Sequence, residues 1–155
     1  MPRNDMTLNP DRPGAPPDPI ALLVELDTRL ADTLEGVGAL RDRAEPGFRP
    51  VAEDLHALHT RQRAAVGAML RAEGHDPARD GSAFGVVHRA TVALRDWVDG
   101  IDSRVMEPLV EAEKHLLQAY DAAIAAMPET DRRHVLDADR ADLIATLDRH
   151  AGDNG

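Results

Sequence analysis

A carboxylate and an imidazole three residues apart on a helix can bind one metal ion, because both groups lie on one face. Two pairs have the order acid-x-x-His, Glu53 with His56 and Asp131 with His134. A helix turns about 100° per residue, which places Glu53 about 160° from the apolar Leu55 and His134 about 160° from Leu136. Both pairs also stand near predicted helix starts, where acidic residues complement the helix dipole. We interpret them as surface residues.

Four other side chains lie on or beside the apolar faces of predicted helices. Measured from neighbouring core leucines, the offset is about 40° for Glu113 and His59 and about 60° for Asp139 and Asp27. Each residue belongs to a different long helix, so that folding could gather all four in the interior. Carboxylate and imidazole donors suit iron or manganese. The sequence therefore predicts these candidate metal ligands: Glu113, His59, Asp139 and Asp27.

The competing interpretation of these four residues is structural. An unpaired buried carboxylate costs free energy, so an interior Glu113 needs a cation or a hydrogen-bond partner. Arg41 and Arg140 lie near the same apolar faces and could supply the charge. We expect a structural salt bridge at Glu113 in preference to a bound metal, because no helix offers a second inward ligand. No cofactor is needed under this interpretation, whereas iron or manganese is the cofactor of the alternative.

The sequence gives more support to a non-enzymatic protein than to an enzyme. The chain contains two serines, Ser82 and Ser103, and both suit helix N-caps rather than nucleophiles. Gly81 and Gly85 stand at a predicted helix start without the strand or lysine of a phosphate-binding loop. Cysteine is absent, which excludes disulfides and thiolate metal sites.

Apolar residues recur at helical spacing through most of the chain. The predicted helices cover residues 19–44, 50–73, 82–98, 104–127 and 131–150. The four long helices predict an all-α antiparallel four-helix bundle over 18–150. The additional short helix at 82–98 would be either a crossover along the bundle or half of a kinked third helix. Residues 1–17, with five prolines, and 151–155 are predicted to be disordered ends.

Composition limits the partners of this 155-residue chain. Its 18 basic and 28 acidic side chains give a formal net charge of −10. An acidic surface disfavours binding to nucleic acid or to an anionic membrane. The N-terminus has no apolar segment of the signal-peptide type, and no apolar run approaches the roughly 20 residues of a membrane span. We therefore expect a cytoplasmic protein.

Two segments resemble a signature of small bacterial ferritin-like proteins of unknown function. One is GHDPARDGSAFGVVHRATVALRDW and the other is EAEKHLLQAYDAAI. The matching positions are Gly74, Asp76, Pro77, Gly81, Ser82, Gly85, His88, Arg89, Glu113 and Tyr120. The resemblance implies a ferritin-like four-helix bundle and no established reaction. Where a related pattern would place a His-Asp pair late in the last helix, this chain has Leu147 and Asp148, and leucine cannot ligate a metal.

Two hypotheses about function follow. The first is a non-enzymatic ferritin-like bundle protein that serves as an interaction or stress-associated accessory protein and retains a degenerate metal site. A homo-oligomer, such as a dimer, or a complex with another protein is then expected, because Val24, Val110 and Leu117 lie off the main apolar faces and are predicted to be exposed. The alternative is an iron- or manganese-binding ferritin-like protein that uses the inward carboxylates and a histidine.

Overall fold

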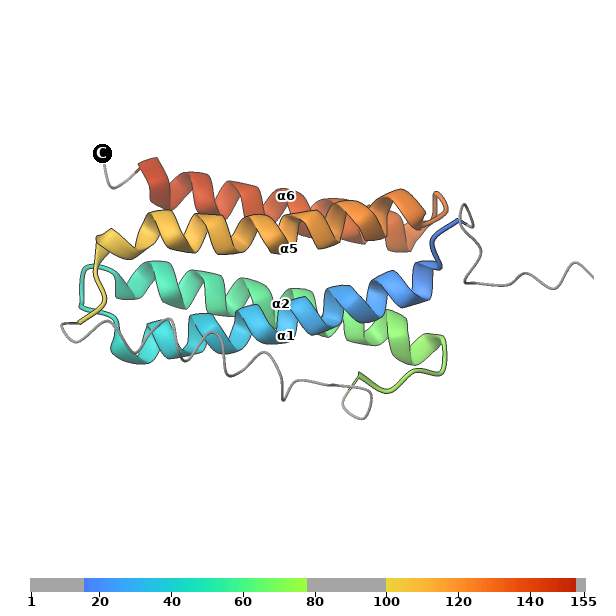
Figure 1. The fold of residues 1–155 in the computed structure, drawn as a ribbon, viewed down its shortest axis with the longest axis horizontal. Coiled ribbons are helices and arrows are strands. Elements are labelled where there is room, and N and C mark those ends of the chain that lie inside the picture. Colours follow the sequence, from blue (N-terminus) through green and yellow to red (C-terminus); the bar gives the residue numbers. More distant parts are fainter. Residues whose placement is uncertain (1–15, 78–99, 153–155) are drawn as a thin grey trace, which may run out of the picture.

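In the described part of the chain, four long helices pack together as a bundle (Figure 1). The computed structural model describes residues 16–77 and 100–152. The helices are α1 (Pro19–Arg43), α2 (Arg49–Ala72), α5 (Met106–Ala126) and α6 (Asp131–Gly152), and the short 3-10 helix η1 (Ser103–Val105) precedes α5. No strand occurs in these residues beyond an isolated bridge between Ala44 and Ile101. The predicted all-α bundle is confirmed, while the predicted helix at 82–98 lies outside the described residues.

α2 and α5 run in the same direction through the bundle. α1 and α2 form an antiparallel hairpin, and α5 begins beside the end of α1, where the Ile101 amide donates to the Arg43 carbonyl. α2 ends at the opposite end of the bundle from the start of α5 (Figure 1). α1 packs on α2 and α5, and α6 packs on the same two helices. Each helix is consequently antiparallel to both of its neighbours.

Local sequence signals explain where the helices begin and end. The Asp18 carboxylate accepts a hydrogen bond from the Ile20 amide at 3.0 Å and caps α1, and Pro19 occupies the first helical position. Gly74 follows α2 with φ of 79°, a conformation that glycine adopts without steric cost. α6 continues through Ala151 and Gly152, which had been assigned to the disordered end.

The core is aliphatic, as the scarcity of aromatic residues predicts. Leucines from all four long helices are fully buried, among them Leu23, Leu30, Leu55, Leu116 and Leu136. Tyr120 is also fully buried in this core. Val24, Val110 and Leu117, expected to be exposed, are instead partly buried and pack against the core. None of the helices in the described ranges is long and apolar enough to cross a membrane.

Candidate polar site in the bundle interior

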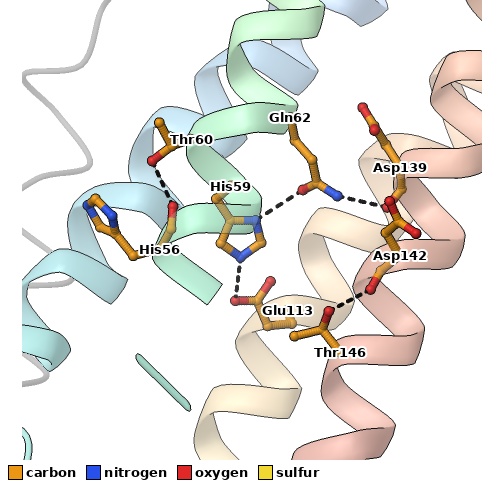
Figure 2. A network of polar contacts seen from close by, with 8 residues as sticks. All are labelled: His56, His59, Thr60, Gln62, Glu113, Asp139, Asp142 and Thr146. Atoms are coloured by element: carbon orange, nitrogen blue, oxygen red, sulfur yellow. Dashed lines mark hydrogen bonds and ion pairs between the residues drawn. The ribbon is translucent and has the colours of Figure 1, made fainter. Parts of the chain in front are cut away.

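A buried histidine and a buried glutamate meet between α2 and α5 (Figure 2). His59 and Glu113 lie on the inward faces of these helices, and neither residue exposes any surface. Nε2 of His59 lies 3.1 Å from Oε1 of Glu113. The contact confirms that Glu113 has a structural partner, but the partner is His59 and not an arginine. A direct hydrogen bond within the protein can satisfy a buried carboxylate without any bound ion.

Gln62 extends this contact to a third helix. It stands three residues after His59 on α2, so both side chains lie on the same helix face. Its Oε1 lies 3.1 Å from Nδ1 of His59, and its Nε2 donates to the backbone carbonyl of Asp139 on α6 at 2.7 Å. The hydrogen-bonded chain thus runs from α5 through α2 to α6 (Figure 2). We call Glu113, His59, Gln62 and the Asp139 carbonyl the interior network.

Asp139 joins the interior network through its backbone and not through its carboxylate. Figure 2 shows the carboxylate pointing away from His59 and Glu113. Burial raises the pKa of Asp139 to about 6, an effect that Asp142 increases and Arg61 opposes. The Asp139 carboxylate therefore lies in a poorly solvated environment beside the network, turned away from the two groups with which it was predicted to bind a metal.

Asp27, the fourth predicted ligand, has its own partner. Its Oδ1 lies 3.4 Å from Nε of Arg63, one turn beyond His59 on α2. Burial raises the pKa of the Asp27 carboxyl, and the guanidinium groups of Arg63 and Arg71 oppose this rise. Asp27 is therefore held in a salt bridge at the interface of α1 and α2, separate from the interior network.

The two arginines expected near Glu113 pair with other acids. Arg140 donates to Asp121 at 2.6 Å on the outer side of α5 and α6, and Arg41 lies 3.5 Å from its neighbour Asp42. Both contacts join partly or fully exposed side chains, where water solvates the charges. The prediction that either arginine neutralises an interior carboxylate is therefore wrong.

The two pairs with Glu-x-x-His spacing lie at the surface, as the helical angles predicted. Glu53, Asp131 and His134 are exposed, and His56 is half-buried. Burial and the neighbouring Arg41 lower the pKa of His56, because both disfavour its protonated form. These residues stand apart from the interior network, and within residues 16–77 and 100–152 no three His, Asp or Glu side chains are grouped so as to hold a metal ion.

Three buried side-chain oxygens near the network have no hydrogen-bond partner in the described part of the chain. They are Oε2 of Glu113, Oδ2 of Asp139 and the hydroxyl of Tyr120. Burial raises the pKa of the Tyr120 phenol, and the negative charge of Asp139 adds to the effect. Unpartnered buried oxygens are uncommon in folded proteins, so these three are positions where the interior could accept a hydrogen bond from an added donor or bind a cation.

Sequence reasoning did not identify Gln62 as part of this site. The signal was present, because Gln62 is a polar residue on the apolar face of α2, three positions after His59. Glutamine is a weak metal ligand, but it both donates and accepts hydrogen bonds. Tyr120 is fully buried in the core, and no interval in the sequence indicates that its hydroxyl lacks a partner among the described residues.

The fold and the site define an all-α four-helix-bundle protein with a buried polar network linking three of its helices. A family model described as a domain of unknown function, DUF2383, matches residues 18–126. The chain belongs to this family. The match includes α1, α2 and α5, and thereby His59, Gln62 and Glu113, but ends before α6. No match was found among curated proteins or among solved structures.

Proposed function

We propose that this chain is a ferritin-like bundle protein that works without catalysis, as an interaction or stress-associated accessory protein, and that its interior network is a degenerate metal site. The helix arrangement supports the ferritin-like assignment. Ferritin-like bundles have one crossover between parallel helices, and here α2 and α5 are parallel, with the end of α2 and the start of α5 at opposite ends of the bundle. The two segments that resemble the ferritin-like signature support the same assignment.

The direct contact between His59 and Glu113 is the observation that carries this proposal. A metal site requires its donor atoms to face a common empty position. Here Nε2 of His59 and Oε1 of Glu113 face each other at 3.1 Å instead. Asp27 is paired with Arg63, and the Asp139 carboxylate is turned away. The four predicted ligands therefore do not converge on one point.

The surrounding positions also lack the ligands of a two-metal site. Such bundles use a carboxylate from each of two helices and a Glu-x-x-His pair from each of the other two. Three residues before His59 the chain has His56, which is half-buried and lies on the outer side of α2. Three residues after Asp139 it has Asp142, which is exposed and pairs with Arg61. Neither helix supplies a complete inward pair.

Iron or manganese binding is the second candidate function, and the unpartnered oxygens favour it. Oε2 of Glu113 is fully buried, accepts no hydrogen bond within the described residues, and lies on the carboxylate that faces His59. A cation could draw this oxygen and the imidazole of His59 toward itself. Carboxylate and imidazole donors suit either metal. One ion bound by few protein groups would complete its coordination with water.

Metal content distinguishes the two candidates. The protein is purified without chelators or a metal-affinity column, loaded anaerobically with ferrous iron or manganese, and analysed by elemental mass spectrometry. A ratio near zero per chain supports the degenerate site. A ratio near one or two in the wild type and in the surface variant Glu107→Ala, but near zero in Glu113→Ala, would contradict it and support metal binding.

The accessory role predicts association with protein rather than with nucleic acid or membrane. The net charge of −10 disfavours polyanionic partners, and we propose a cytoplasmic location on the same sequence grounds. Self-association is measured by size-exclusion chromatography with light scattering across a range of protein concentrations. A dimer or larger assembly supports a homo-oligomer, whereas a strict monomer at high concentration would contradict it and leave another protein as the partner.

A further inference from the structure

We propose that Gln62 is a positioning residue that fixes the ring tautomer of His59, so that Nδ1 always carries a proton and Nε2 is the nitrogen presented to Glu113. This inference deepens the second candidate function, because it identifies the ring nitrogen that would bind a metal. The tautomer itself does not depend on whether a metal binds. Four hydrogen-bonding groups on three helices carry the argument.

The argument begins at the backbone carbonyl of Asp139. A carbonyl oxygen only accepts hydrogen bonds, so the Gln62 atom 2.7 Å away must be its NH₂ group. The carbonyl oxygen of the same amide then faces the opposite way, toward His59. An amide can normally be reversed by rotation about its last bond, but here reversal would set two carbonyl oxygens against each other. The main chain of α6 therefore fixes the orientation of the Gln62 amide.

The orientation of Gln62 in turn fixes the proton on His59. Oε1 of Gln62 can only accept, and it lies 3.1 Å from Nδ1. Nδ1 must therefore donate, which requires a proton on this nitrogen. Gln62 and His59 are both fully buried. If the tautomer were reversed, no water could therefore replace the hydrogen bond between Nδ1 of His59 and Oε1 of Gln62. The unprotonated form of Nδ1 is thus strongly disfavoured.

Nε2 is left as the nitrogen that interacts with Glu113. With a proton on Nδ1, the neutral ring has its lone pair on Nε2, directed at Oε1 of Glu113 3.1 Å away. One proton then lies between the two groups, either on the carboxyl or on a positively charged ring. A metal ion could take the place of that proton. Histidine ligands commonly bind a metal through one nitrogen while the other donates to an oxygen, as Nδ1 does here.

Nuclear magnetic resonance of the histidine ring nitrogens tests this inference in the metal-free protein. The His59 signals are assigned by their loss in His59→Asn. In the wild type we expect a proton on Nδ1. In Gln62→Leu, Nδ1 loses its acceptor and we expect the proton to move to Nε2, where it can bond to Glu113.

Two outcomes would overturn the inference: a wild-type His59 with an unprotonated Nδ1, or an unchanged tautomer in Gln62→Leu. The control Gln118→Leu, at an exposed position on α5, should leave the His59 signals in place. If Gln62→Leu does not fold, the position of the proton in the wild type still decides the question. A wild-type His59 that carries a proton on Nε2 and none on Nδ1 would be sufficient to reject the inference.

A zinc titration separates this inference from the metal-binding candidate. Zinc is diamagnetic, so the ring signals remain observable when it binds. We expect zinc to shift Nε2 of His59 and not Nδ1, and Gln62→Leu to weaken zinc binding by about 10- to 100-fold. The expected tautomers together with no effect of zinc would support the positioning role of Gln62 and count against metal binding. A shift at Nδ1 instead would contradict the assignment of Nε2 as the ligand.

Discussion

His59 and Glu113 lie on two parallel helices of the bundle and meet at 3.1 Å in an interior where neither side chain exposes any surface. A buried polar pair gains its stability from mutual satisfaction, and removing one partner leaves the other desolvated. We expect His59→Leu and Glu113→Leu each to lower the free energy of unfolding by about 3–5 kcal/mol. Urea denaturation followed by circular dichroism measures the loss.

The double variant His59→Leu with Glu113→Leu provides the control for this prediction. It removes both polar groups together, so its loss of stability should be clearly smaller than the sum of the two single losses. Leu55 and Leu116 nearby offer the apolar surroundings that the new leucines would join. Additive losses would show that the two side chains are not coupled.

Removing the salt bridge between Asp27 and Arg63 should destabilise the protein by an amount that depends on pH. Arg63 opposes the rise in the pKa of Asp27 that burial causes, so in Arg63→Met this pKa should rise further. The variant should lose about 1 kcal/mol at neutral pH, a modest value because the arginine is 38% exposed. The loss should vanish in acid, where Asp27 is protonated in both proteins. In an Asp27→Asn background, Arg63→Met should have little effect at any pH.

For Asp139, we expect the contribution of the side chain to the stability of the fold to decrease as the pH rises. Burial raises its pKa from 3.8 to about 6, so between these values the folded state binds a proton that the unfolded state has released. The contribution of Asp139 to stability is therefore greatest below about pH 4 and falls as the pH rises through 6. Asp139→Asn removes this dependence. The variant should match the wild type near pH 4 and exceed its stability by up to about 3 kcal/mol at pH 8.

Chemical denaturation at several pH values measures this difference for Asp139→Asn. Asp137→Asn is the matched control, because it removes the same charge at an exposed position of the same helix. A wild type that gains stability relative to Asp139→Asn as the pH rises would contradict the prediction.

Tyr120 is the single tyrosine of the chain, which makes its ionisation directly measurable. Burial of the phenol and the nearby charge of Asp139 both raise its pKa, so it should remain protonated for as long as the bundle is folded. In an alkaline titration, tyrosinate absorbance should appear only together with the loss of helical circular dichroism. Ionisation of Tyr120 in the fully helical protein would show that its hydroxyl is solvated.

Most of the helical architecture was predictable from local sequence. Apolar periodicity located the four long helices, and Asp18, Pro19 and Gly74 marked their ends because capping and left-handed geometry depend on a few adjacent residues. The same periodicity placed Glu113 and His59 on inward faces, and both are fully buried. The exposure of Val24, Val110 and Leu117 was predicted less well, since burial at the edge of an apolar face depends on the neighbouring helix.

The sequence by itself determined which residues form helices and which faces they bury, because both depend on intervals of three and four residues along one chain. Only the tertiary structure decided which buried polar groups meet. Glu113 meets His59, 54 positions away, and Gln62 meets the carbonyl of Asp139, 77 positions away. The axial register of one helix against another sets these pairs, and no interval within a single helix specifies it. The same register pairs Asp27 with Arg63 in a salt bridge and places the carboxylate of Asp139 so that it points away from the network.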